Sequence, residues 1–375
     1  MTASRPEPGP PTEPVVSPKA LAPDLGLDQR GSTALDQWRG FALALVLVSH
    51  GFYFTGRVSG LGRVGVNLFF FISGILVFRT LSRSRAVNDW DRSRSFWWRR
   101  FRRLYPALIG YLVLILPAMW WLQRLPRLPG LSTFSDCLDY LWPSLFYVSN
   151  YYPRPMPYGH LWSLGCEMQF YLVAPFIYLA GGRTPVRRTL VFGTLLFVLL
   201  ALGAIEPLVP KIVARLGRAY NPEWKYHFEL AVWPMMAGFF CEYRREWFSG
   251  LPEKIVTSAY WISLLSCLAS FVLMLFGAEM KFLVVAAGTL LLFPCLLAYL
   301  YGRPAAGRPG NVLRWLGERT YSIYLWQQPL TICSFLPSLL HPAGALFSIV
   351  LGAVSFRFLE YPFLSVNRQR QKSAG

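Results

Sequence analysis

Residues Arg39–Gly51 read RGFALALVLVSHG, in which an arginine precedes nine residues without a hydrogen-bonding side chain and the run closes on Ser49 and His50. The stretch lies in an apolar run over about 40–57, close to the 20 residues that cross a bilayer as one helix. Over all 375 residues, 54% are hydrophobic and 15% are charged, which leaves too little polar surface to coat a soluble globule. The sequence therefore predicts an all-α polytopic membrane protein.

Ten apolar runs predict about ten transmembrane helices and a multi-pass protein of the cell (inner or plasma) membrane. The runs cover residues 40–57, 63–80, 104–122, 160–180, 189–207, 227–243, 256–277, 281–301, 320–340 and 343–361. Lys and Arg are concentrated in alternate connecting segments, which is the pattern of cytoplasmic loops. This bias predicts that both termini are cytoplasmic.

One membrane domain, 35–363, is expected between two cytoplasmic tails. Residues 1–29 hold seven prolines and no apolar core, so they predict a disordered tail over 1–34 rather than a cleavable signal peptide. Residues 364–375 form a short basic tail. The six cysteines include no CxxC pair, so neither a disulfide framework nor a metal site is predicted.

Arg39 and His50 are eleven residues apart, which is about three helical turns, so they share one helix face about 16 Å apart. An ionisable group at the depth of His50 costs free energy unless it faces a cavity or a partner. Two interpretations stay open: a neutral histidine that donates to a carbonyl of a neighbouring helix, or a functional base.

Glu167 lies in HLWSLGCEMQFYL, His160–Leu172, about 10 Å below the external surface if this run enters the membrane from outside. That depth is close to the depth expected for His50. A carboxylate there would orient the imidazole and stabilise its cation for general-base catalysis. The alternative is a protonated glutamic acid that cross-links two helices.

Nine arginines lie between Arg79, at the end of the second run, and Arg103, just before the third, both included, and four of them belong to the stretch WWRRFRRLYP. Their density fits positive-inside topology or anionic lipid headgroups. It fits equally a site in which guanidinium groups grip a polyanion such as the phosphates of coenzyme A. The net charge of +18 is thus explained without nucleic acid as a partner. The candidate donor-binding residues are Arg39, Arg99, Arg100, Arg102 and Arg103.

Taken in order from Leu35 to Pro362, these segments resemble the acyltransferase-3 family of integral membrane O-acyltransferases, mostly bacterial. The resemblance rests on six features: arginine, ten residues and histidine at Arg39 and His50; GVxLFFxxSG, Gly65–Gly74; RRFxRxYP, Arg99–Pro106; LWSLxxExQFYL, Leu161–Leu172; YSIYLWQQP, Tyr321–Pro329; and FRFLEYPF, Phe356–Phe363.

The chain departs from the family at a few positions. Asn67 stands where the family often has aspartate, Met168 where it often has a second glutamate, and Gln327 and Gln328 where histidines often occur. No proton-transfer role is therefore assigned to Asn67 or Gln327, and catalysis falls on His50 and Glu167. Two roles stay open for the candidate pocket residues: contact with a substrate, or packing between helices. These residues are Asn67, Trp162, Ser163, Tyr324 and Gln327.

The resemblance implies transfer of an acyl group, acetyl in our prediction, from cytoplasmic acyl-coenzyme A (acetyl-CoA) to a hydroxyl of a carbohydrate-containing acceptor, a cell-surface or exported glycan. Acyl-CoA is a co-substrate, and no permanently bound cofactor is expected. The arginines would hold its phosphates, and His50, oriented by Glu167, would act as general base or be acylated first. Membrane lipids are the remaining expected partners, and the sequence gives no prediction of oligomeric state.

Two alternatives remain at this stage. The acceptor hydroxyl can belong to a lipid or a secondary metabolite, a choice for which the sequence offers no discriminator. A proton-coupled transporter or flippase would instead use His50 and Glu167 as a proton relay and the arginines to bind lipid phosphates.

Overall fold

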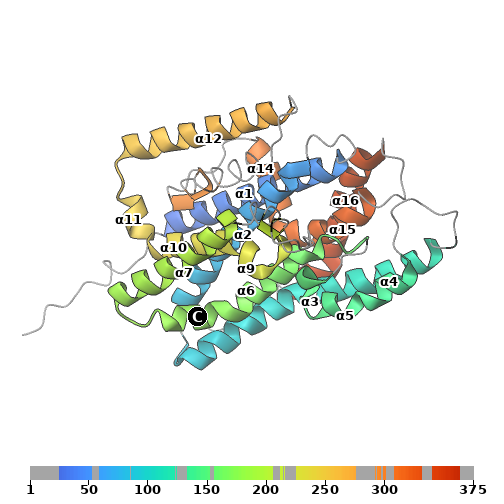
Figure 1. Cartoon of the computed structure of the whole chain (residues 1–375), viewed down its shortest axis with the longest axis horizontal. Helices are drawn as coiled ribbons and strands as arrows, with labels where there is room; N and C mark the ends of the chain where they lie inside the picture. Colours follow the sequence, from blue (N-terminus) through green and yellow to red (C-terminus); the bar gives the residue numbers. More distant parts are fainter. Residues whose placement is uncertain are drawn as a thin grey trace, which may run out of the picture.

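All regular elements in the part of the chain that the structure describes are helices (Figure 1). The computed structural model describes residues 25–52, 59–84, 86–122, 124, 133–152, 156–205, 212–213, 215, 225–275, 292, 294–296, 299–300, 308–331 and 340–363. Within these ranges the all-α prediction is confirmed.

The helices fall into long elements and short connecting turns. The long helices are α1 (Leu25–Gly51), α2 (Ser59–Ser82), α3 (Asp89–Leu122), α6 (Leu161–Ala180), α7 (Pro185–Ile205), α10 (Trp233–Tyr243), α12 (Glu253–Leu275), α14 (Arg308–Glu318), α15 (Thr320–Thr331) and α16 (His341–Ser355). The short ones are α4 (Phe134–Asp139), α5 (Leu141–Leu145), a 3-10 turn (Ser149–Tyr151), α9 (Phe228–Ala231), α11 (Arg245–Ser249) and a π-helical turn (Phe356–Glu360).

Among the described residues, four helical stretches are long and apolar enough to cross a bilayer, judged by length and composition. They are Gly60–Ser82, Asp89–Leu122, Pro185–Ile205 and His341–Phe363. The predicted total of about ten spans and the cytoplasmic position of both termini stay predictions. The expected span over 281–301 lies almost entirely outside the described residues.

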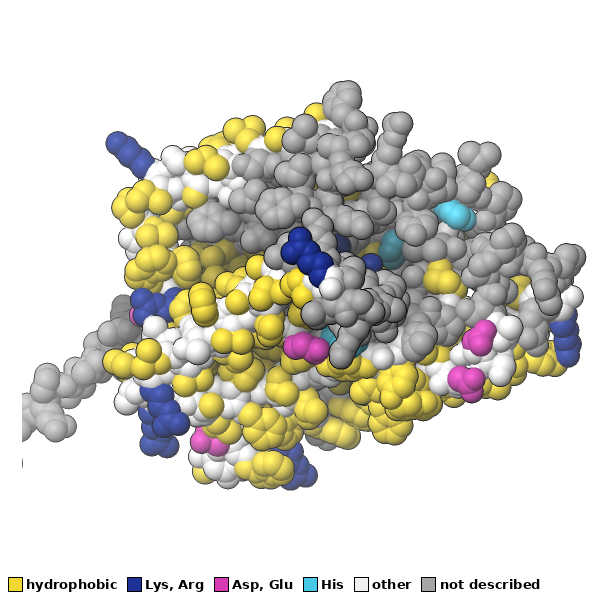
Figure 2. Space-filling view, in the orientation of Figure 1, with side chains coloured by type: hydrophobic (Ala, Val, Ile, Leu, Met, Phe, Trp, Pro, Cys, Tyr) yellow, Lys and Arg dark blue, Asp and Glu magenta, His cyan; other side chains and the backbone are white. Residues whose placement is uncertain are grey.

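Helix α2 lies inside the bundle, whereas α7 lies at its surface. The apolar window of α2 is 72% buried and that of α7 only 6% buried. Figure 1 places α1 and α2 centrally, with α3 along one edge and α12 along the opposite one. Hydrophobic side chains cover most of the described surface on the face drawn in Figure 2, and Lys and Arg lie mainly toward its edges. An outer surface of this kind suits contact with lipid tails.

Glycines on α2 let its neighbours approach closely. A Cβ added at Gly65 would lie 2.5 Å from the carbonyl oxygen of Ala42 on α1, and one at Gly74 would lie 1.9 Å from that of Met235 on α10. No side chain larger than hydrogen fits at such distances, so these two residues set the spacing of α1 and α10 against α2.

Two boundaries differ from the sequence prediction. Helix α1 begins at Leu25, so the tail expected over 1–34 is helical from residue 25 onward. Its last turns before the apolar run bury Ala34 and Leu35, each only 1% exposed, and this burial outweighs the polar composition of the segment. Helix α3 begins at Asp89 rather than near 104, so most of the arginine-rich segment is helical. Residues 1–24 and 364–375 lie outside the described residues.

Candidate active site

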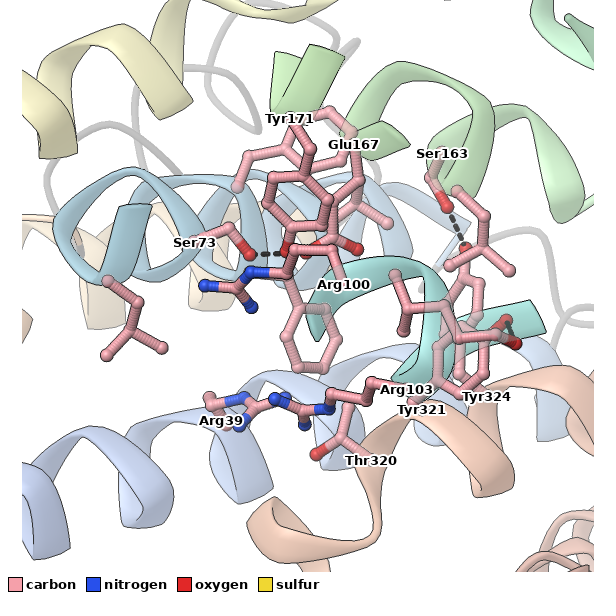
Figure 3. A pocket seen from close by; sticks show the side chains of 16 residues that line it. Arg39, Ser73, Arg100, Arg103, Ser163, Glu167, Tyr171, Thr320, Tyr321 and Tyr324 are labelled. Atoms are coloured by element: carbon pink, nitrogen blue, oxygen red, sulfur yellow. Dashed lines mark hydrogen bonds between the residues drawn. The ribbon is translucent and has the colours of Figure 1, made fainter. Parts of the chain in front are cut away.

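Five helices contribute side chains to one cavity (Figure 3). Its polar lining consists of Arg39 from α1, Ser73 from α2, Arg100 and Arg103 from α3, Ser163, Glu167 and Tyr171 from α6, and Thr320, Tyr321 and Tyr324 from α15. The cavity leaves about 50 Å³ for the centres of water-sized molecules, enough for a few waters. Residues far apart in the sequence thus form one small polar chamber inside an apolar bundle.

Helical periodicity divides the predicted donor-binding arginines into two groups. Arg100 and Arg103 lie three residues apart on α3, so they share the face that lines the cavity, and Arg39 joins them from α1. Arg99 and Arg102 are not among the lining residues, and Arg99 is exposed. The structure therefore brings together three of the five candidates.

Each of the three arginines is held differently. The Nε of Arg103 lies 3.4 Å from Oε1 of Glu360, a fully buried carboxylate that also accepts a hydrogen bond from Ser322 at 2.9 Å. Arg39 lies 3.7 Å from Asp36, one turn earlier on α1.

Arg100 stacks over the ring of Tyr171, with its guanidinium carbon 4.6 Å from the ring centroid. Among the described residues, no carboxylate lies within ion-pair distance of Arg100. Arg100 is consequently the cavity arginine whose charge is least neutralised by a direct partner.

Glu167 lies across the cavity from Arg39 and Arg103, whereas Arg100 lies near it, over the ring of Tyr171 (Figure 3). Oε1 of Glu167 accepts a hydrogen bond from Ser73 Oγ at 2.5 Å and another from the hydroxyl of Tyr171. Glu167 thereby cross-links α6 to α2 on the wall of this cavity. Asp36 and Glu360 pair with Arg39 and Arg103, so Arg100 is the lining charge most available to an anion. An interior of low dielectric strengthens the attraction between such a charge and an anion.

His50 lies three turns further along α1 than Arg39 and is not a lining residue of this cavity. Its Nδ1 makes a hydrogen bond with Oε1 of Gln327 on α15. No hydrogen bond joins His50 and Glu167 among the described residues, because each is engaged elsewhere. The orienting contact expected between them is therefore absent here, and their catalytic roles stay predictions.

The other predicted pocket residues occupy different positions. Ser163 and Tyr324 both line the cavity and their hydroxyls hydrogen-bond at 2.7 Å. Trp162 does not line it and packs edge-on against Phe70, with ring centroids 6.1 Å apart. Asn67 and Gln327 are also buried outside the lining.

Sequence reasoning missed several members of the site. Tyr171 lies one turn after Glu167 on α6, and Ser73 lies in the quoted GVxLFFxxSG stretch, so helical spacing offered a signal for both. Thr320 also lines the cavity. Glu360, in the quoted FRFLEYPF stretch, pairs with Arg103 from the π-helical turn, and its own segment gave no signal for that partner. In the described parts of the chain, no cluster of three or more His, Cys, Asp or Glu side chains is placed to hold a metal ion.

Comparison with known protein families assigns the chain to one of them. A family profile described as an acyltransferase domain, acyltransferase-3, matches residues 32–359. The chain belongs to the acyltransferase-3 family. The resemblance predicted from the six sequence features is thereby confirmed, and the apolar helices agree with a membrane-embedded member of that family.

Relatives of this acyltransferase-3 chain include proteins named as peptidoglycan O-acetyltransferases. It is 27% identical over 364 residues to the putative peptidoglycan O-acetyltransferase YrhL of Bacillus subtilis, covering 88% of this chain and 54% of the relative. It is 26% identical over 358 residues to the peptidoglycan O-acetyltransferase OatA of Listeria monocytogenes, covering 88% and 55%. A shorter match, 34% over 136 residues, links it to the acyltransferase MdmB of Streptomyces mycarofaciens, covering 35% and 32%.

The chain spans about half the length of the two peptidoglycan O-acetyltransferases. No solved structure matches it significantly.

Proposed function

We propose that the protein is an O-acyltransferase of the cell membrane that moves an acyl group, acetyl, from cytoplasmic acyl-coenzyme A to a hydroxyl of a cell-surface or exported glycan. Family membership supports the reaction class. The names of two relatives, both peptidoglycan O-acetyltransferases, support acetyl as the group and a glycan as the acceptor. The observation that carries the proposal is the cavity of Arg39, Arg100 and Arg103, reached by the same helix that carries His50.

The arginine cavity suits the phosphates of the donor. Guanidinium groups make paired, charge-assisted hydrogen bonds to phosphate oxygens. The separation of Arg39 and His50, about 16 Å along α1, is similar to the length of a pantetheine arm, about 15–20 Å by ordinary bond lengths. Phosphates held near Arg39 would place the thioester near His50.

Binding requires the cavity to widen, because about 50 Å³ holds a few waters and no coenzyme. Arg100 is the arginine best placed to move, since it stacks on a ring and is not tied to a carboxylate. Glu167 would act on this donor side, because it lines the same cavity as Arg39 and Arg103.

In the proposed chemical step, His50 acts as the general base. Its imidazole would take the proton from the acceptor hydroxyl while the hydroxyl oxygen attacks the thioester carbonyl carbon. The carbon–sulfur bond then breaks, and coenzyme A leaves as a thiolate that takes up a proton. The alternative order, in which the imidazole is acylated first and passes the group onward, balances the same bonds in two steps.

A transfer assay tests the proposal. Purified full-length protein in nanodiscs would be incubated with acetyl-labelled acetyl-CoA and, in parallel, with peptidoglycan fragments, a phospholipid or a small apolar alcohol. Label in an alkali-labile ester on the glycan fraction is the expected result. Label on the lipid or the alcohol alone would refute the glycan acceptor, and proton-coupled transport without any transfer would refute the enzyme.

A further inference from the structure

The side chain of Gln327 spans from α15 to His50 on α1. It is fully buried, and its Oε1 makes the only hydrogen bond that the described residues offer to the imidazole. With the Gln327 amide in this orientation, its carbonyl oxygen can only accept, so Nδ1 of His50 would carry the proton and donate it. In a neutral imidazole this leaves Nε2 with a free lone pair, which is the form a general base needs.

Nε2 points toward a position that carries no side chain. A Cβ added at Gly62 on α2 would lie 3.7 Å from Nε2 and 3.0 Å from Oγ of Ser49. With glycine at position 62, no side chain of that residue lies beside the nitrogen that would take the proton. The contact with Gln327 lies on the other side of the ring, at Nδ1.

The geometry of Gln327 is fixed by its helix. α15 packs against both α1 and α16. α16 packs closely against α15 at Gly352, because a Cβ added there would lie 2.4 Å from Cα of Ile323 on α15. An anchored, buried side chain holds a ring more firmly than an exposed one.

Gln327 is poorly explained as a packing residue alone. Its amide nitrogen is buried and has no hydrogen-bond partner among the described residues. A buried donor left unpaired costs free energy, whereas an apolar side chain of similar size at this site would avoid that cost. The neighbouring residue differs: Oε1 of Gln328 accepts from both the backbone nitrogen of His160, at 2.6 Å, and its Nδ1, at 2.8 Å.

We propose that Gln327 is a positioning residue for His50, which holds the imidazole with Nδ1 protonated and Nε2 free to accept the proton of the acceptor hydroxyl. The inference rests on the proposed function, because it assigns His50 the role of base. In this proposal, the hydrogen bond from His50 to Gln327 replaces the orienting contact that was expected from Glu167.

Four variants of the full-length protein in nanodiscs test the inference. Gln327→Met keeps the volume and removes the acceptor, Gln327→Glu keeps an acceptor in place, and Gln327→Asn keeps the amide but is too short to reach His50. Thr331→Val is the control, because it removes a buried hydrogen bond on the same helix without touching the imidazole.

We expect Gln327→Met and Gln327→Asn to lower kcat about 100-fold, the lower end of the 10²–10⁴-fold that positioned proton transfer provides. The KM for acetyl-CoA should stay within about twofold, since the donor phosphates lie at the arginine cavity. Gln327→Glu should retain at least about tenfold more kcat than Gln327→Met, because a carboxylate oxygen still accepts from Nδ1. Thr331→Val should leave kcat unchanged.

Two results would overturn the inference: a kcat for Gln327→Met within threefold of wild type, or an equal loss in Gln327→Met and Gln327→Glu. If Gln327→Met does not fold, the kcat of Gln327→Asn is compared with wild type in its place. Combination with His50→Ala separates this inference from the proposed function, because Gln327→Met should cause no further loss once the imidazole is gone. Full activity in His50→Ala alone would instead refute the assignment of His50 as base.

Discussion

Arg100→Gln should weaken binding of the acyl donor, and Arg99→Gln should not. The two arginines are adjacent in α3, carry the same charge and differ in direction, since Arg100 lines the cavity and Arg99 is exposed. If these arginines served only membrane topology or attraction to lipid headgroups, the two substitutions would have the same effect on donor binding. A phosphate site inside the bundle would be sensitive to Arg100 alone, so the pair forms its own matched control.

The size of the effect follows from the contacts of Arg100. A hydrogen bond to a charged group contributes about 1.5–3 kcal/mol, and about 1.4 kcal/mol corresponds to a factor of ten in affinity. Loss of Arg100 should therefore raise the KM for acetyl-CoA about 10- to 150-fold. The protein itself should lose little stability, because no described carboxylate depends on this arginine and its contact with Tyr171 is a cation–π contact.

The assay is steady-state turnover in nanodiscs with acetyl-CoA and the acceptor varied separately. The KM for the acceptor should change less than twofold in both variants. Equal KM values for acetyl-CoA in Arg100→Gln and Arg99→Gln would refute the assignment of the cavity to the donor. A parallel rise for donor and acceptor in Arg100→Gln would point to a folding defect instead.

Two further predictions concern stability. Glu360→Gln leaves Arg103 without its buried carboxylate and should lower the free energy of unfolding by up to about 3 kcal/mol, seen as a lower Tm in detergent, and an unchanged Tm would contradict the structural role of this pair. Gly74→Val forces a Cβ to within 1.9 Å of the Met235 carbonyl oxygen and should destabilise the protein by about 3 kcal/mol or more. The control Gly193→Ala, whose Cβ meets its nearest atom at 3.9 Å, should fold normally, and equal Tm values for the two variants would show that the approach of α2 and α10 is not tight.

Sequence patterns located the main parts of the site along the chain. Depth in the membrane follows from residue counting, so Arg39, Arg100 and Arg103 were expected at one mouth of the bundle and do line one cavity. Rotation of each helix about its axis does not follow from counting. The predicted depth of Glu167 was also wrong. Glu167 was expected level with His50, but it lines the cavity with Arg39, three turns away along α1, and hydrogen-bonds Ser73 and Tyr171.

Elements without an apolar run were the hardest to predict. Helix α14 is short and polar on one face, so a search for spans passes over it. The role of Glu360 depends on a π-helical turn that brings its carboxylate to Arg103, 257 residues away in the sequence. Long-range pairs of this kind are set by the packing of several helices together, and a single segment holds no signal for them.

The most direct test of the central claim compares wild type with His50→Ala in nanodiscs, using labelled acetyl-CoA and the glycan acceptor. His50 is half-buried on α1, and alanine preserves the helix, so the variant should insert and fold. We predict that transfer falls at least about 100-fold, while the KM for acetyl-CoA, where measurable, stays near the wild-type value. Transfer at near wild-type rates in a folded His50→Ala protein would contradict the account.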